Sequence, residues 1–191
     1  MKIILGTASK QRREVFEEMG YDFTVMSADI NEKEIRSRNP EELTVALAKA
    51  KAAELLKRIT EPAILITADQ VIGRGGEIRE KPKDADQARE YLRTCHEVPV
   101  RIVNGIAVTN TQTGAQAAEN DTALVTFRQI PEEIVERLVG EGRVFSWAGA
   151  FATKDPLIAP YVASMDGADG SSRGLPKALV SRLMQEVQTA E

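Results

Sequence analysis

The chain has 191 residues, of which 42% are hydrophobic and 28% are charged, a composition typical of a globular protein. The formal net charge of −4 argues against a protein that wraps a nucleic-acid polymer, although a local cluster of cations could still bind a small anion. The one cysteine, Cys95, excludes an internal disulfide framework and favours a reducing compartment, so we expect a cytoplasmic protein. We expect neither a leader nor a membrane segment, because no apolar run approaches the length that spans a bilayer.

The predicted elements alternate between strands and helices. Apolar residues at helical spacing predict helices, and runs rich in β-branched residues predict strands. The first half contains a strand over 2–7, a helix over 10–19, a strand over 21–25, a polar stretch over 27–39, a helix from 39 to about 58 and a strand over 63–68. The second half contains a hairpin over 71–78, a helix from 84 to about 93, strands over 98–109 and 117–129, a helix from 131 to about 139, a strand over 157–164 and a helix over 175–187. This order predicts one α/β domain over residues 1–191, with a mixed central sheet flanked by helices.

The first predicted helix begins with three cations, although the helix dipole already places partial positive charge there. Lys10 and Arg13 each have a glutamate four residues further on, but Arg12 has no acidic partner within the helix. Arg12 also continues the apolar stripe of the helix towards its N-terminus. These features favour an anion site made by Arg12 and the free helix N–H groups. The alternative is a solvated basic helix end, capped by Ser9.

Two further charged residues interrupt apolar patterns. Lys51 occupies the step at which Leu43, Leu47 and Leu55 predict an apolar side chain. It could contact a ligand, or its stem could pass the apolar neighbours and carry the ammonium group to water. Asp69 follows the apolar run AILITA, at the end of a strand where α/β sheets present ligand sites. A buried carboxylate there needs cations, a metal or hydrogen bonds, and the alternative is one satisfied by a neighbouring loop.

Two more candidates are weaker when taken alone. Lys81 is separated from Asp69 by a short hairpin, and Glu32 lies in the polar stretch over 27–39. A surface lysine and an acidic loop are the respective alternatives. His96 and Cys95 are treated as structural or incidental, and no serine–histidine–aspartate triad can be assembled. The two commonest phosphate-binding glycine loops are absent from the sequence.

The charged candidates together indicate one kind of chemistry. Cations neutralise phosphate oxygens, a divalent metal bridges them, and a carboxylate orients or deprotonates water. The set therefore predicts a polyphosphate ligand and hydrolysis of a phosphoanhydride. Its cations are Arg12, Arg13, Lys51 and Lys81, and its carboxylates are Glu32 and Asp69.

Six short motifs occur in order along the chain. They are ASKQRREVF for an S-x-x-R opening, LAKAKA for L-A-x-x-K-A, ADQVI for A-D-T/Q-V, EKP for K-P, WAGAF for A-G-x-Y/F, and RGLPKALV for a closing G-L-P. Each is weak alone, but six at matching intervals are specific. The chain resembles, over essentially its whole length, the Maf proteins, nucleotide pyrophosphatases named for their effect on septum formation.

The resemblance implies an inosine-triphosphatase-like α/β fold with two lobes and a cleft, often as a homodimer. It implies hydrolysis of a nucleoside triphosphate to the monophosphate and pyrophosphate, with Mg²⁺ or Mn²⁺. Asp69 would be the catalytic base that activates water, and Glu32 would help it to bind metal. Lys51 and Lys81 would act in catalysis by holding phosphates, and Ser9 and Arg12 would hold phosphates as well.

Three positions of the resemblance bear on the nucleobase: Gln11, Gln70 and Lys154. Gln70 and the phenylalanine of AGAF favour a subgroup that acts on 7-methyl-GTP. Gln11 and Lys154 do not fit that subgroup, because the first lacks a stacking indole and the second would repel a cationic purine. A subgroup that acts on dTTP and UTP differs at these positions as well, so both preferences stay open.

Two other classes of function stay open beside the enzyme. The first is a non-catalytic nucleotide-binding regulator of cell division, against which the retained carboxylates argue. The second is a nucleic-acid-binding protein, which the acidic balance disfavours. We therefore expect a nucleoside triphosphate as partner, with no nucleic-acid polymer and no membrane.

Overall fold

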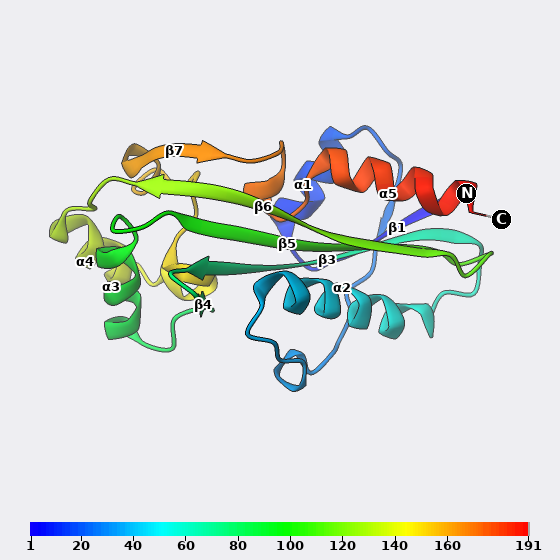
Figure 1. Ribbon diagram of the computed structural model, residues 1–191, viewed down its shortest axis with the longest axis horizontal. Coiled ribbons are helices and arrows are strands. Elements are labelled where there is room, and N and C mark those ends of the chain that lie inside the picture. The colour runs from blue at the N-terminus through cyan, green and yellow to red at the C-terminus, as the bar shows by residue number, and fades with distance from the viewer. Residues whose placement is uncertain (191) are drawn as a thin grey trace. The chain divides into compact units, whose positions relative to one another are not determined.

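The structure, a computed structural model, describes residues 1–190 and has a mixed α/β architecture (Figure 1). Its seven-stranded sheet comprises β1 (Lys2–Gly6), β2 (Thr24–Val25), β3 (Ala63–Arg74), β4 (Glu77–Arg79), β5 (Val100–Asn110), β6 (Gln116–Phe127) and β7 (Val162–Asp166). The α-helices are α1 (Lys10–Glu18), α2 (Pro40–Leu56), α3 (Ala85–Thr94), α4 (Glu132–Gly140) and α5 (Lys177–Thr189). The predicted mixed sheet with flanking helices is confirmed.

The chain forms two compact units, each built from separate stretches of sequence. The first unit contains residues 1–70, residues 103–122 and the chain from Ala168 onward. The second contains residues 71–102 and 123–167. Strands β3, β5 and β6 contribute residues to both units. The single domain over 1–191 and the cleft between lobes stay predictions. Among residues 1–190, no helix combines the length and the apolar character needed to cross a bilayer.

The first unit contains the parallel part of the sheet. β1 pairs in parallel with β2 on one side and with β3 on the other. The ladder between β1 and β3 ends where Gly6 lies opposite Thr67. β3 then continues without its β1 neighbour. Residues just after Thr67 therefore lie at the carboxyl end of β1, where α/β sheets place ligands.

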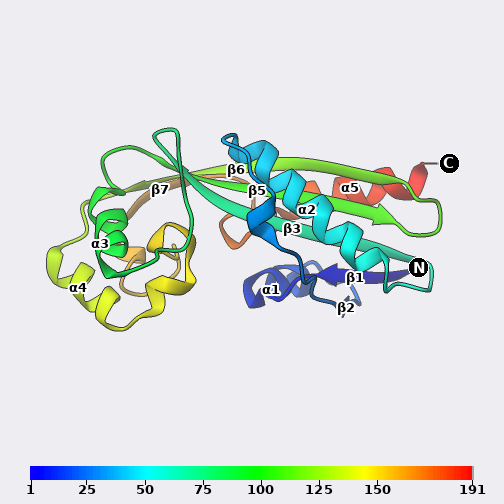
Figure 2. The same ribbon diagram turned by 90° about the horizontal axis from the view of Figure 1, so that it is seen from below.

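Helices cover both faces of this sheet. Alternate residues of a strand face opposite sides, and β3 follows this rule. Ile64 and Ile66 pack with α1 and α5, whereas Ala63 and Leu65 pack with α2. Figure 1 shows α5 and α2 on opposite sides of the strands, and Figure 2 shows α2 lying across them. The two faces near Thr67 are therefore supplied by different helices.

A glycine allows α2 to approach the sheet closely. A Cβ atom added to Gly105 of β5 would lie 2.2 Å from the backbone carbonyl carbon of Thr44 in α2. Backbone atoms of a packed helix cannot yield as a flexible side chain can. Gly105 therefore fixes the position of α2, the helix that carries Lys51.

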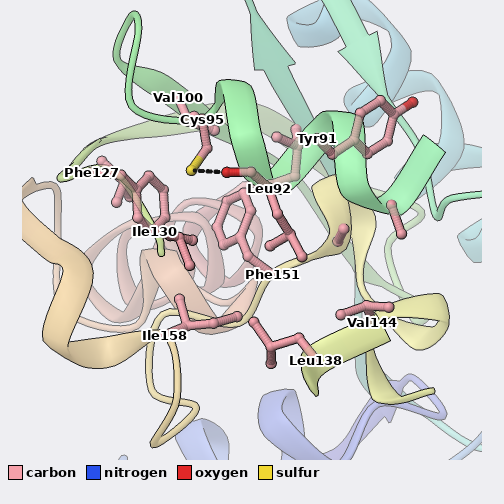
Figure 3. Packing of buried hydrophobic residues seen from close by; sticks show 14 of the residues in the cluster. Tyr91, Leu92, Cys95, Val100, Phe127, Ile130, Leu138, Val144, Phe151 and Ile158 are labelled. Atoms are coloured by element: carbon pink, nitrogen blue, oxygen red, sulfur yellow. Dashed lines mark hydrogen bonds between the residues drawn. The ribbon is translucent and has the colours of Figure 1, made fainter. Parts of the chain in front are cut away.

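The second unit has its own apolar core, formed by α3, α4 and the strands around them (Figure 3). Phe127 and Phe151 pack edge to face in it, with ring centroids 5.0 Å apart. Cys95 is buried there, and its Sγ donates to the carbonyl oxygen of Leu92 at 3.1 Å. Burial raises the pKa of the Cys95 thiol to about 11. The thiol therefore stays protonated at neutral pH, in line with a structural residue.

Several predicted boundaries are confirmed by their capping and turn residues. Asn39 caps α2, since its side-chain Oδ1 accepts from the N–H groups of Glu41 and Glu42. The hairpin between β3 and β4 turns at Gly75 and Gly76, whose φ values are 56° and 86°. Positive φ is accessible to glycine without steric cost. Local chemistry alone predicts these features.

The prediction of a strand over 157–164 is wrong in its first half. Residues 159–161 form a 3₁₀-helix, and β7 begins only at Val162. The N–H groups of Ile158 and Ala159 both donate to the carbonyl oxygen of Asp155, which withdraws them from any sheet. Pro160 has no N–H group to offer.

Two other strand predictions have the wrong length. The strand over 21–25 is reduced to β2, because Tyr21 stacks on Phe16 and Phe23 packs edge to face against it instead of extending the sheet. The strand over 63–68 continues to Arg74. Asp69 therefore lies inside β3, and the strand that ends beside it is β1.

Replacing Gly105 with alanine tests the close approach of α2. The added methyl group cannot fit against the Thr44 backbone, so we expect Gly105→Ala to lower the free energy of unfolding by about 1–3 kcal/mol. Urea denaturation followed by circular dichroism measures this change. Gly140→Ala is the control, because nothing lies within 4 Å of the added atom. Equal losses in both variants would contradict the packing described here.

Candidate active site

A lysine and two carboxylates meet in the first unit. The Nζ atom of Lys51 lies 2.5 Å from Oδ1 of Asp69 and 2.8 Å from Oε1 of Glu32. The side chains of Lys51 and Asp69 are only 13% and 11% exposed, whereas that of Glu32 is 55% exposed. Glu32 lies in a 3₁₀-helix, Glu32–Glu34, inside the polar stretch before α2. The structure thus gathers three candidates from separate elements around one ammonium group.

The apolar stripe of α2 places Lys51. Leu43, Leu47 and Leu55 are buried on this stripe, as their spacing predicts. On β3, Thr67 faces α2, because its Oγ1 donates to the carbonyl oxygen of Ala48 at 2.7 Å. Asp69 lies two residues further on and therefore faces the same helix. The Lys51 stem follows the stripe, and its ammonium group binds Asp69 instead of reaching water.

Burial controls the protonation of Asp69. It raises the pKa of this carboxyl, and Glu32 raises it further. The charges of Lys51 and Arg12 act in the opposite direction but do not cancel the effect of burial. Asp69 is consequently a better proton acceptor, when ionised, than an exposed aspartate. A shifted carboxyl beside a specific cation is typical of an active site.

Arg12 is folded against the end of β1. Its Nη1 donates to the carbonyl oxygen of Ala68 at 2.8 Å, and its Nε donates to that of Gly174 at 3.0 Å. Ala68 is the first residue of β3 beyond the ladder with β1. Burial lowers the pKa of Arg12, while Asp69 and Glu32 raise it. Nε and Nη1 thus both donate to backbone carbonyl oxygens, and an anion contact through the remaining nitrogen, Nη2, stays a prediction.

The start of α1 agrees with its predicted cap. Ser9 Oγ accepts from the N–H of Arg12 at 3.4 Å, and no acidic residue occupies the first turn. Lys10 pairs with Glu14 at 3.5 Å, as their spacing predicts. The Nε atom of Arg13 is buried without a hydrogen-bond partner in the described chain. Gln11 is exposed on the same helix. The phosphate and base contacts of these residues stay predictions.

The structure also reveals polar residues that the sequence analysis missed. The Nε2 atom of Gln70 donates to Oδ1 of Asn104 at 3.0 Å, and Asn104 in turn contacts Ser171 and Asp121. Asn104 is a buried polar residue in an apolar strand, which is the same anomaly that identified Asp69. That signal was available in the sequence VNGIAV, although Asn-Gly more often predicts a turn.

Two candidates lie in the second unit. Lys81 is exposed just after β4, and Lys154 is exposed between two 3₁₀-helices, Ala148–Ala150 and Ala159–Tyr161. The other candidates all belong to the first unit. Participation of Lys81 and Lys154 in the site therefore stays a prediction.

The donor set fits a magnesium-type ion. Within residues 1–190 there is no group of three or more histidine, cysteine, aspartate or glutamate side chains that could hold a metal by itself. Glu32 and Asp69 nevertheless place two carboxylate oxygens around one cation, the ammonium group of Lys51. Mg²⁺ in phosphate-handling sites is typically bound by one or two carboxylates together with substrate phosphates. The residues present fit an ion that is bound along with its substrate.

Comparisons with known proteins place the chain in a family. The family described as Maf-like protein matches residues 2–187. The chain is 38% identical to a 7-methyl-GTP pyrophosphatase of Dictyostelium discoideum, over 97% of this chain and 96% of that one. It is 32% identical to a dTTP/UTP pyrophosphatase of Geobacter sp. (strain M21), over 91% and 89%. A solved structure of a HAM1 protein from Coxiella burnetii is 14% identical, covers 69% of this chain and 75% of its own, and has a TM-score of 0.42, a likeness too low to carry any argument.

Titration of Asp69 tests the electrostatics of the site. In the metal-free protein, we expect the pKa of Asp69 to lie above that of an exposed aspartate, because burial disfavours its charge. Lys51→Met should raise this pKa further, since the Lys51 charge lowers it. Carbon-13 NMR of the side-chain carboxyl measures both values. Lys57→Met is the control, because Lys57 pairs with Glu54 at the end of α2. An Asp69 pKa that Lys51→Met leaves unchanged would refute the contact.

Proposed function

The chain belongs to the family of Maf-like proteins, and from this premise we propose that it is a nucleoside triphosphate pyrophosphatase. It hydrolyses the anhydride between the α- and β-phosphates, releasing a nucleoside monophosphate and pyrophosphate. The observation that carries the proposal is the contact between Lys51 and Asp69, a buried carboxylate of raised pKa. The relative named for 7-methyl-GTP and the relative named for dTTP and UTP are both pyrophosphatases, which supports the reaction class.

Asp69 and the cations have different proposed roles in the reaction. Asp69 takes a proton from water as the water oxygen bonds to phosphorus, and the bridging P–O bond breaks as pyrophosphate leaves. The triphosphate is a polyanion, so binding requires positive charge. Nη2 of Arg12, the N–H groups at the start of α1 and the ammonium group of Lys51 supply this charge, with Ser9, Arg13 and Lys81 as further phosphate ligands.

A divalent metal, Mg²⁺ or Mn²⁺, completes the proposal. Glu32 and Asp69 would hold it, and a bound metal would neutralise phosphate charge. Lys51 contacts both carboxylates, so it holds them together before the substrate arrives. Its location also allows it to turn towards a phosphate oxygen, since the ammonium group ends a flexible stem.

Selection of the nucleobase is assigned to Gln11, Gln70 and Lys154. The relatives include a 7-methyl-GTP pyrophosphatase and a dTTP/UTP pyrophosphatase, so both a methylated purine and a pyrimidine are candidate bases. We further propose a cytoplasmic homodimer that removes unwanted nucleotides from the pool. A non-catalytic nucleotide-binding regulator of cell division is the alternative. Replacing Asp69, the proposed catalytic base, distinguishes the enzyme from the regulator.

Asp69→Asn tests the role of the base. We expect pyrophosphate release to fall by roughly 10²- to 10⁴-fold, which is the usual effect of losing a general base. Nucleotide binding should survive, because the cations remain. The melting temperature at pH 7 should not fall, since a carboxyl of raised pKa costs folding stability when ionised. Unchanged hydrolysis over a panel of canonical and methylated triphosphates would reject this assignment, and no release by the wild-type protein with metal present would reject the function.

Arg12→Ala tests the anion site at the start of α1. Loss of its charge-assisted contact should lower kcat/KM for the preferred triphosphate by roughly 10- to 100-fold. Lys10→Ala is the matched control, because it removes one positive charge from the same helix end and Lys10 is exposed. Steady-state kinetics at fixed ionic strength compares the two variants. Similar losses in both would mean that only the overall charge of the helix end matters.

A further inference from the structure

We infer that Asn104, Ser171 and Asp121 fix the orientation of the Gln70 side-chain amide, so that its oxygen Oε1 is left to accept an N–H donor from the nucleobase. The inference rests on the proposed function, because it concerns the base of the same nucleotide. Asn104 and Asp121 are thus positioning residues, and Gln70 is the residue that contacts the ligand. The chemical class selected is a base with an N–H group on its pairing edge.

A backbone carbonyl group sets the orientation of the Asn104 side-chain amide. The carbonyl oxygen of Ser171 can only accept hydrogen bonds, and it lies 2.9 Å from Nδ2 of Asn104. Oδ2 of Asp121, also an acceptor when ionised, lies 3.4 Å from the same nitrogen. Both neighbours therefore require the amino end of the Asn104 amide. Asn104 is fully buried, so its amide cannot satisfy the other orientation with water.

The orientation of the Asn104 amide determines that of the Gln70 amide. Because the Asn104 nitrogen faces Ser171 and Asp121, its Oδ1 is the atom that meets Gln70. Nε2 of Gln70 donates to this oxygen at 3.0 Å and also lies 3.4 Å from the Ser171 carbonyl oxygen. Two acceptors thus require the same end of the Gln70 amide. Oε1 has no hydrogen-bond donor within residues 1–190, and it is not among the fully buried unpartnered atoms.

Asp121 anchors the segment that provides the carbonyl. Oγ of Ser171 donates to Oδ2 of Asp121 at 2.5 Å, which ties the 3₁₀-helix Ser171–Arg173 to β6. The residue after this helix, Gly174, supplies the carbonyl oxygen that holds Arg12. One short segment therefore contacts both Gln70 and Arg12. By anchoring this segment, Asp121 positions both Gln70, which would contact the base, and Arg12, which would contact a phosphate.

Gln70 also lies where a ligand can reach it. It follows Asp69 on β3 and faces the opposite side of the sheet, the side covered by α1 and α5. The ladder with β1 ends at Thr67, so this stretch of β3 lacks its β1 neighbour. A ligand at the end of β1 can therefore meet residues from both faces. Guanine N1–H and uracil N3–H are donors of the required kind.

Methylated nucleotides test which atom of Gln70 faces the base. Affinities of GTP against N1-methyl-GTP, and of UTP against N3-methyl-UTP, are measured by calorimetry without added metal. We expect the preferred unmethylated nucleotide to bind roughly 10-fold or more tightly than its methylated form, because methylation removes the donor. Gln70→Leu and Asn104→Leu should both reduce this ratio towards one. A ratio that Gln70→Leu leaves intact would show that methylation acts by size alone, and the inference would fail.

Two controls separate positioning from general damage. Asn110→Leu removes another buried asparagine of β5, whose Nδ2 donates to the Val187 carbonyl oxygen at 3.1 Å, and should lower stability without changing the ratio. The affinity for inorganic triphosphate, which has no base, should stay unchanged in Gln70→Leu, because the positions of Asn104, Asp121 and the segment that holds Arg12 do not depend on Gln70. A parallel loss of triphosphate affinity would overturn the inference.

A double-mutant cycle completes the test. In the Gln70→Leu background, Asn104→Leu should have no further effect on the methylation ratio, because the two residues act as one unit. Asp121→Leu, which removes the acceptor for both Ser171 and Asn104, should also reduce the ratio and replaces Asn104→Leu if that variant does not fold. Independent, additive effects would overturn the inference. The binding ratios need no turnover, so a protein that failed to release pyrophosphate would reject the proposed function and still report on Gln70.

Discussion

The site depends on one interaction, the contact of the Lys51 ammonium group with the buried carboxylate of Asp69. An ionised aspartate inside an apolar strand is unfavourable, because it loses its hydration. Lys51 can offset this loss only because the stripe of α2 carries its stem along β3, and Gly105 lets the helix lie that close. The compensation is incomplete, since the pKa of Asp69 remains raised. Because burial raises this pKa more than the nearby cations lower it, ionised Asp69 is more basic than an exposed aspartate.

The length of β1 provides the second constraint. Because β1 ends opposite Thr67 while β3 continues, the carbonyl oxygen of Ala68 becomes available to Arg12. The same ending brings the start of α1 to this edge of the sheet. The backbone geometry of two parallel strands thus decides where positive charge accumulates. Side chains from both faces of β3 then become accessible from one side.

Sequence reasoning singled out Lys51 and Asp69, which the structure brings into contact, and missed Asn104, Asp121 and Ser171. Lys51 and Asp69 each interrupt an apolar pattern of known period, so their positions are visible as exceptions. The contacts of Ser171 with Asn104 and Asp121 join residues 67 and 50 positions apart, and no local pattern encodes such pairs. The strand expected over 157–164 failed for a related reason, because the carbonyl oxygen of Asp155 withdraws the N–H groups that the strand would need.

The interleaved arrangement of the first unit has a consequence for synthesis of the protein. Lys51 and Asp69 are 18 residues apart and can meet early, whereas Arg12 and Gly174 are separated by 162 residues. A ribosome adds about 5–20 residues per second, so the guanidinium group waits roughly ten seconds or more for its carbonyl partner. During that interval Lys51 and Asp69 have both been made, whereas Arg12 still lacks the Gly174 carbonyl oxygen. The order of translation therefore delays completion of these contacts until Gly174 has been made.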